Sequence, residues 1–131
     1  MTYREAPIHK AILRYLSYAL PGAWIMHPAN ELAMGGDRRA KAIAQAKAKS
    51  LGMLPGAPDI IALWHGNLWA FEVKAPGNYP TDTQKTVGAH IERMGGRWAV
   101  VRSVDEAAAC VAAWMEQAPR AAAIKMVGEV R

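Results

Sequence analysis

Hydrophobic and polar residues follow two different periods along the chain, and the order of these periods predicts an α/β domain. From Ile8 to Ala19 the apolar residues recur at helical spacing, and Pro21 with Gly22 ends the pattern. Four short apolar runs bounded by turn residues predict strands. Longer stretches that open with capping residues predict the remaining helices. In chain order, the predicted elements are helix 5–19, strand 24–27, helix 38–50, strands 60–64 and 68–73, helix 81–94, strand 98–101 and helix 103–115.

The length and composition fit a single domain. The chain has 131 residues, of which 52% are hydrophobic, and this is enough to build one buried core. We expect one domain over residues 1–131, with its core at 5–117. The Ala-rich tail at 118–131 is open to three interpretations: a helix extension, a contact with another subunit, or a frayed end.

The two central strands flank Gly66-Asn67 and predict a β-hairpin with a residue at positive φ in its turn. With Gly66-Asn67 as a two-residue loop, Asp59 comes opposite Lys74, and Glu72 lies on the diagonal within about 8 Å. A three-residue loop would turn Asp59 to the other face of the sheet, unless a β-bulge restored the phase. We therefore expect the two-residue register, or a bulge with the same result.

Charged residues at the open end of this hairpin are the candidate chemical groups. Glu72 and Lys74 lie on the same face of one strand, about 6.6 Å apart, and Asp59 joins them in the expected register. Two converging carboxylates make an all-oxygen site that suits Mg²⁺ or Mn²⁺, and the lysine adds a compact positive charge. The plainer alternative is a salt bridge at the edge of the sheet, because structural ion pairs resemble functional sites.

The net charge of +5 is concentrated in the predicted helix 38–50. Between positions 37 and 49 the chain carries five basic residues and one acidic residue. A concentrated basic patch attracts a polyanion, and nucleic acid is the common polyanion for such a domain. A solvated basic face is the alternative. The residues expected to contact DNA phosphates are Arg38, Arg39, Lys41 and Lys49.

Two further features bear on the compartment. Cys110 is the only cysteine, so an internal disulfide is excluded and a reducing compartment is natural. The first residues lead into an amphipathic segment instead of an apolar signal core, and no run approaches the roughly 20 apolar residues of a membrane span. We expect a cytoplasmic protein that makes no membrane contact.

Taken together, these residues resemble a known nuclease signature. Pro58-Asp59, followed after a hairpin by Glu72-Val73-Lys74, is similar to the PD-(D/E)XK motif. The set as a whole is similar to the VRR-NUC branch of that superfamily, and the resemblance covers most of the chain. The additional positions that indicate this branch are residues 52–59, Asn30-Glu31, Glu5, Thr81 and Gln84.

The resemblance implies a fold and a set of site residues. The implied fold is a restriction-endonuclease-like core of order αβββαβ, with a mixed central sheet flanked by helices and helix 38–50 inserted between the first two strands. Lys74 and Gln84 are implied as catalytic residues beside a Mg²⁺ or Mn²⁺ ion, and Asn30 as a DNA contact near the active cleft. The implied metal ligands, of which the carboxylates also count as catalytic, are Asp59, Glu72, Glu5 and the main-chain carbonyl of Val73.

Some of these residues have simpler explanations in the sequence alone. Glu5 can favour the dipole at a helix N-terminus or complete a capping box there. Gln84 completes a capping box with Thr81, and Asn30 fits a turn. His27 has no second histidine at ligand spacing, and we interpret it as structural.

The function implied by the resemblance is metal-dependent hydrolysis of DNA. Small stand-alone VRR-NUC proteins, many from phages, resemble homodimeric endonucleases that cut branched DNA, including four-way (Holliday) junctions. We therefore expect a homodimer that acts on branched DNA in the cytoplasm of a bacterium or a phage-infected host. The alternatives are a nuclease directed to flaps or nicks, a non-catalytic DNA-binding or assembly module, and a plain salt-bridged α/β domain.

Overall fold

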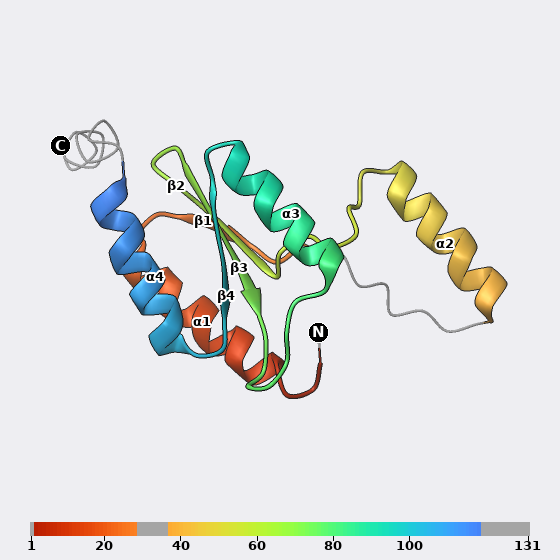
Figure 1. Cartoon of the computed structure of the whole chain (residues 1–131), viewed down its shortest axis with the longest axis horizontal. Helices are drawn as coiled ribbons and strands as arrows, with labels where there is room; N and C mark the ends of the chain where they lie inside the picture. Colours follow the sequence, from red (N-terminus) through yellow and green to blue (C-terminus); the bar gives the residue numbers. More distant parts are fainter. Residues whose placement is uncertain (1, 29–36, 119–131) are drawn as a thin grey trace.

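The computed structural model describes residues 2–28 and 37–118, which form one sheet with helices on both faces (Figure 1). The elements are α1 (Ala6–Ala19), β1 (Trp24–Met26), α2 (Arg38–Ser50), β2 (Ile60–Trp64), β3 (Asn67–Val73), α3 (Asp82–Arg93), β4 (Arg97–Val101) and α4 (Val104–Gln117). This order confirms the predicted αβββαβ core, with the basic helix inserted between β1 and β2. Asn30 and the tail from 119 to 131 lie outside the described residues. Among the described helices, none has the length and apolar character that a membrane span needs.

The sheet has the strand order β1-β2-β3-β4 and is mixed, as expected. β1 pairs with β2, and β2 with β3, in antiparallel fashion. β3 and β4 are parallel, so the chain must cross from one end of the sheet to the other between them. α3 makes this crossing. A loop joins the end of β3 at Val73 to the start of α3 at Asp82.

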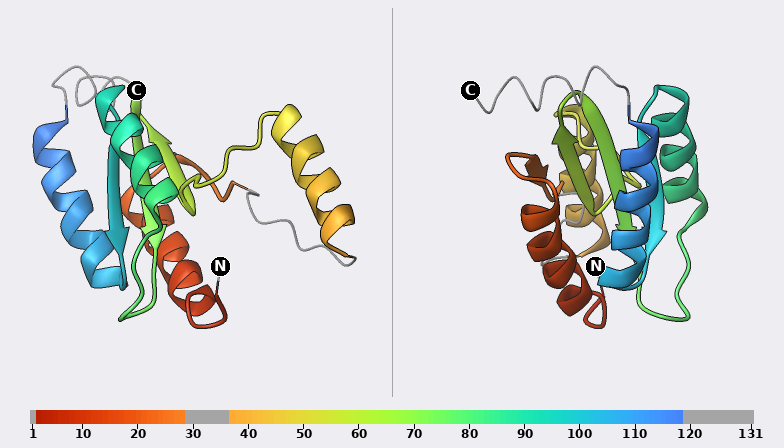
Figure 2. Two further views of the ribbon diagram at one scale, coloured as in Figure 1. Left: turned by 45° about the vertical axis from the view of Figure 1, so that its right-hand side comes forward. Right: turned by 90° about the vertical axis from the view of Figure 1, so that its left-hand side faces the viewer.

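The helices divide between the two faces of the sheet. α1 and α4 lie together on one face, where they cover the main core, and α3 lies on the other (Figure 2). α3 packs so closely that a Cβ atom at Gly88 would come within 2.3 Å of the Trp98 ring on β4. The residues of the main core are Ile12, Leu16, Leu20, Ile60, Ala62, Trp64, Trp69, Phe71, Val73, Val101, Ala107 and Val111.

The turn of the hairpin differs from the prediction by one residue. β2 and β3 pair up to Trp64 and Asn67, so the loop is His65-Gly66, and the predicted Gly66-Asn67 loop is wrong. Both loop residues have positive φ, 49° at His65 and 80° at Gly66, which is the backbone of a type I′ turn. Asn67 instead begins β3, and its side-chain amide donates to the Trp64 carbonyl at 3.1 Å.

The corrected turn moves the register by two residues and leaves every side chain on its predicted face. Ile60 pairs with Phe71, and counting one residue further brings Asp59 opposite Glu72 instead of Lys74. Side chains alternate between faces with a period of two. Asp59 and Glu72 therefore share a face, as predicted, and they lie closer together than the diagonal placement expected from the sequence.

α2 begins at the predicted cap and stands away from the sheet (Figure 1). The Asp37 side chain accepts a hydrogen bond from the Ala40 amide at 2.8 Å, which satisfies a free N–H of the first turn. No residue of α2 is buried, and even Ile43 is 60% exposed. The helix therefore contributes a charged outer surface rather than core.

Candidate active site

Asp59 and Glu72 meet at the open end of the β2-β3 hairpin, on the face of the sheet that carries α3. Asp59 is 7% exposed and Glu72 is 1% exposed. The Asp59 carboxylate accepts a hydrogen bond from the Val73 amide at 2.8 Å, which ties it to the neighbouring strand. Lys74 follows, half-buried, and its own amide donates to the Val101 carbonyl of β4 at 3.0 Å. The structure thus brings together the three residues predicted as the centre of the site.

The Glu72 carboxyl group is incompletely paired for a group so deeply buried. One oxygen, Oε1, accepts a hydrogen bond from the Gln84 side-chain amide at 3.1 Å. The other, Oε2, is contacted by no N–H or O–H donor of the described residues, and the side chain lies within hydrogen-bonding reach of the Asp59 carboxyl, so the two acids can share a proton. Burial raises the pKa of Glu72 to about 9, the neighbouring Asp59 carboxyl adds to the rise, Lys74 opposes it, and Glu5 adds a smaller contribution. Without a cation, this site holds a proton at neutral pH.

These features fit a divalent cation better than a plain salt bridge. A buried, unpaired carboxylate oxygen is costly, and a cation would satisfy it while offsetting the repulsion between the two acids. Across residues 2–28 and 37–118, no three His, Cys, Asp or Glu side chains are grouped to hold an ion together. Mg²⁺ keeps several waters and commonly takes only one or two carboxylates, so Asp59 and Glu72 are the residues that could hold such an ion, with Glu5 reaching it through water.

Glu5 is buried beside this pair and does not cap the helix in the way the sequence alone suggested. It is the N-cap residue of α1, yet its side chain makes no capping hydrogen bond. Its carboxylate instead accepts a hydrogen bond from the Thr2 hydroxyl at 2.8 Å, and only 2% of the residue is exposed. The charge of Glu5 adds to the rise in the pKa of Glu72, so Glu5 interacts with the site. A capping role alone does not explain this interaction.

Gln84 forms the predicted capping box and also contacts the acidic pair. Its side-chain oxygen accepts from the Thr81 amide at 2.8 Å, and the Thr81 hydroxyl accepts from the Gln84 amide at 3.2 Å, which is the predicted capping box. The NH₂ group of the same side chain donates to Glu72. One amide therefore joins the start of α3 to the acidic pair.

His27 contacts Asp59 and His9 packs against His27, and the sequence interpretation missed the part of both histidines in the site. His27 Nδ1 lies 2.6 Å from the Asp59 main-chain oxygen, and because a carbonyl can only accept, the imidazole N–H donates. The His9 ring packs edge-on against His27, with 4.7 Å between ring centroids. Burial, followed by the charge of His27, lowers the pKa of His9, and Asp59 opposes this. The spacing of Glu5 and His9, four residues apart on one helix face, was the only sequence signal.

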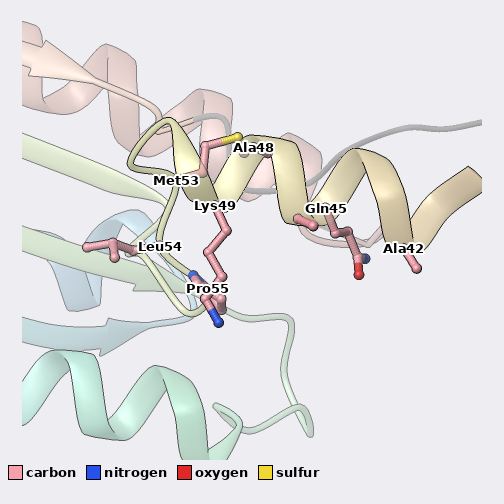
Figure 3. Close-up of a pocket in the computed structure, with 8 residues that line it drawn as sticks. Ala42, Gln45, Ala48, Lys49, Met53, Leu54 and Pro55 are labelled. Carbon is pink, nitrogen blue, oxygen red and sulfur yellow. The ribbon is translucent and has the colours of Figure 1, made fainter.

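The basic residues predicted to contact DNA lie outside this cluster. Arg38, Arg39, Lys41 and Lys49 are all exposed on α2, which stands apart from the sheet and is joined to β2 by residues 51–59 (Figure 2). The end of α2 and the segment after it enclose a hollow of about 410 Å³, with Lys49 extended toward Pro55 (Figure 3). None of the acidic site residues lines this hollow, so α2 forms a basic surface separate from the acidic pair.

The fold resembles that of solved structures. One, titled "VRR_NUC domain protein", matches with a TM-score of 0.62 at 16% identity, covering 88% of this chain and 91% of the other. Another, titled "VRR_NUC domain", matches with a TM-score of 0.52 at 20% identity, covering 88% and 97%. No protein-family model and no curated protein matches the sequence.

These matches define the class of the fold. It is an α/β fold in which a mixed four-stranded sheet carries helices on both faces. More narrowly, the chain has the fold of a VRR-NUC domain over most of its length, which confirms the resemblance seen in the sequence at the level of structure.

Proposed function

We propose that this domain is a Mg²⁺- or Mn²⁺-dependent endonuclease that hydrolyses phosphodiester bonds in DNA. The observation that carries the proposal is the pair of buried carboxyl groups of Asp59 and Glu72, which lie within hydrogen-bonding reach of each other and have Lys74 beside them. A salt bridge at a sheet edge would not need two acids buried against each other. The likeness in fold to VRR_NUC domains supports the same choice of function.

Asp59, Glu72 and the Val73 carbonyl are the proposed ligands of the cation, with Glu5 acting through water. When bound, the cation supplies a water of lowered pKa and offsets negative charge on the phosphate. Lys74 orients the attacking water or stabilises the charge that develops on phosphorus. Gln84 holds the Glu72 carboxyl in place through its hydrogen bond, which makes it a positioning residue.

The proposed reaction is a hydrolysis in which one bond forms and one breaks. The water oxygen bonds to phosphorus after losing a proton to the surrounding solvent. The bond between phosphorus and the 3′ oxygen breaks, and the leaving oxygen takes up a proton. The products are a 5′-phosphate and a 3′-hydroxyl.

For the substrate we propose branched DNA, with four-way junctions foremost, cut by a homodimer. A two-fold dimer presents two equal sites to a nearly symmetric substrate, and paired cuts across a junction need two such sites. A flap- or nick-directed nuclease is the nearest alternative within the same chemistry. A reducing cytoplasm suits the single cysteine, Cys110, which is free in the structure.

The first experiment compares cleavage of a four-way junction, a flap, a nicked duplex and a continuous duplex in Mg²⁺, Mn²⁺ and EDTA. We expect cutting in either metal, none in EDTA, and the fastest cutting on the junction. Light scattering with and without junction DNA reports the oligomeric state. Binding without cutting in both metals would support the non-catalytic module instead.

The basic surface of α2 gives a second prediction. Replacing Arg38, Arg39 and Lys41 together by glutamine should weaken DNA binding about equally for all sequences. It should also lower the slope of log affinity against log salt by about 0.9 for each lost phosphate contact. Fluorescence anisotropy at salt concentrations from about 50 to about 200 mM measures both the affinity and the slope.

The matched control for this triple variant carries the same charge change elsewhere. Replacing Arg14, Lys85 and Arg93, exposed on α1 and α3, removes three positive charges away from α2. Equal losses in the two triple variants would mean that only net charge matters. Unchanged affinity in the α2 variant would favour the plain salt-bridged domain.

A further inference from the structure

The loop between Lys74 and α3, residues 75–80, is held from two sides and is called the rim loop below. Arg4, which precedes α1, donates from its guanidinium to the Pro76 carbonyl at 3.1 Å. Arg102, which follows β4, donates to the Asn78 carbonyl at 2.8 Å. Two arginines from distant parts of the chain thus fix main-chain atoms of a segment that has no regular structure of its own.

Within the rim loop, Tyr79 is exposed to solvent. Its residue surface is 76% exposed, so burial of the ring contributes little to folding. The Arg102 guanidinium carbon lies 5.2 Å from the ring centroid, which is within the range of a cation–π contact. The hydrogen bond from Arg102 to Asn78 holds the guanidinium in this position. The ring is therefore ordered while most of it faces solvent.

The rim loop connects this ring to the acidic pair through a short chain of contacts. Tyr79 lies two residues before Thr81, and two residues span at most about 7 Å. The Thr81 amide is joined to Glu72 through the Gln84 side chain, by hydrogen bonds of 2.8 and 3.1 Å. The positive side chains of Lys74 and Arg102 flank the same short segment. A strand with one phosphate at Glu72 would therefore come within reach of the ring and these charges over roughly two nucleotides.

We propose that Tyr79, backed by Arg102, is a stacking platform for an unpaired nucleotide base beside the phosphate that is cut. Aromatic rings and arginine planes bind bases by stacking without reading their sequence. In a continuous duplex both faces of each base are covered by its neighbours. The platform therefore selects DNA with an exposed base at the cut, such as a flap, a gap or an open branch point. This inference rests on the proposed nuclease function and narrows its substrate class.

The test measures binding with cleavage removed. In a Lys74→Ala background, Tyr79→Ala is compared with Tyr79→Phe on flapped DNA and on a continuous duplex with the same number of phosphates. One stacked base is worth about 1–3 kcal/mol, so Tyr79→Ala should raise the Kd for flapped DNA by roughly 5- to 150-fold. Tyr79→Phe keeps the ring and should keep the affinity. Neither change should alter binding to the continuous duplex.

Two controls separate stacking from other effects. Tyr18 on α1 is 80% exposed, so Tyr18→Ala removes an equally exposed ring and should leave all affinities unchanged. A 2-aminopurine base in the flap should lose fluorescence on binding when position 79 carries a ring and regain it in Tyr79→Ala. Equal losses on flap and duplex, or no loss on either, would overturn the platform.

Failure of the platform and failure of the nuclease proposal give different results. If the protein with Lys74 intact cuts DNA but Tyr79→Ala binds flaps normally, the nuclease stands and the platform is wrong. If no DNA is cut in Mg²⁺ or Mn²⁺, the nuclease proposal is wrong. In that case the flap-specific loss in Tyr79→Ala still tests the binding role of the ring directly.

Discussion

Replacing Lys74 by alanine is expected to slow DNA cleavage in Mg²⁺ by at least about 10²-fold, the usual loss when one preorganised electrostatic group is removed from a reacting phosphate or acyl centre. DNA affinity should change little, because the basic surface of α2 is separate from the acidic pair. Single-turnover cleavage at saturating protein, together with anisotropy, measures the two effects independently.

Two further variants show whether the charge at position 74 or its shape matters. Lys74→Arg keeps the charge but replaces a compact ammonium by a broad planar group, and it should recover only part of the rate. Lys85→Ala removes an exposed lysine from α3 and should cut at the normal rate. A Lys74→Ala protein that cuts as fast as the unchanged protein would exclude the proposed role.

Replacing Glu72 by glutamine is expected to stabilise the metal-free protein at pH 8 and to abolish its response to Mg²⁺. The pKa of Glu72 is raised to about 9 in the folded chain from an ordinary value of 4.5. A group whose pKa is raised by folding stabilises the folded state fully below its unfolded pKa and loses that contribution as the pH rises through the folded pKa. The unchanged protein in EDTA should therefore lose stability between about pH 4.5 and about pH 9.

Glutamine resembles the protonated acid and removes this loss. At pH 8 the folded chain must take up a proton at Glu72 that the unfolded chain lacks, and glutamine, which is neutral in both states, avoids this cost of a few kcal/mol. The gain corresponds to a rise in melting temperature of several degrees for a domain of this size. The rise should be present at pH 8 and absent at pH 5, as measured by thermal melts in EDTA. Added Mg²⁺ should raise the melting temperature of the unchanged protein only.

The control for this experiment is Glu92→Gln on the exposed side of α3, which should change neither the pH dependence nor the metal response. Lower stability of Glu72→Gln in EDTA at pH 8 would contradict the raised pKa of the Glu72 carboxyl. A Mg²⁺ response that survives the substitution would exclude Glu72 as a ligand.

Periodicity and capping residues were sufficient to predict most of the fold. The helices and strands follow from apolar spacing, and Thr81 with Gln84 forms the predicted capping box. The hairpin turn was misplaced by one residue because Gly66-Asn67 and His65-Gly66 both supply positive φ, and a local pattern does not separate them. The error did not change the predicted site, because a register shift of two residues leaves each side chain on the same face of the sheet.

The parts of the site that depend on distant packing were not predictable. His27 reaches Asp59 across 32 positions, and nothing near His27 in sequence signals that contact. The burial of Glu5 depends on how α1 meets the sheet, which a helical pattern does not specify. The separation of α2 from the sheet was also not foreseen, since its alanines and Ile43 are equally compatible with a packed face.

The Gln84 amide makes the start of α3 and the Glu72 carboxyl a single mechanical unit. Since its oxygen is held by Thr81 and its nitrogen by Glu72, the helix end cannot shift without moving the acid or breaking one of these bonds. A displacement of the preceding loop therefore shifts the Glu72 carboxyl. Because such coupling is reciprocal, a ligand that binds the carboxyl also restrains the loop. In the proposed nuclease, we therefore expect ion binding at Glu72 and DNA binding at the rim loop to be coupled through the Gln84 side chain.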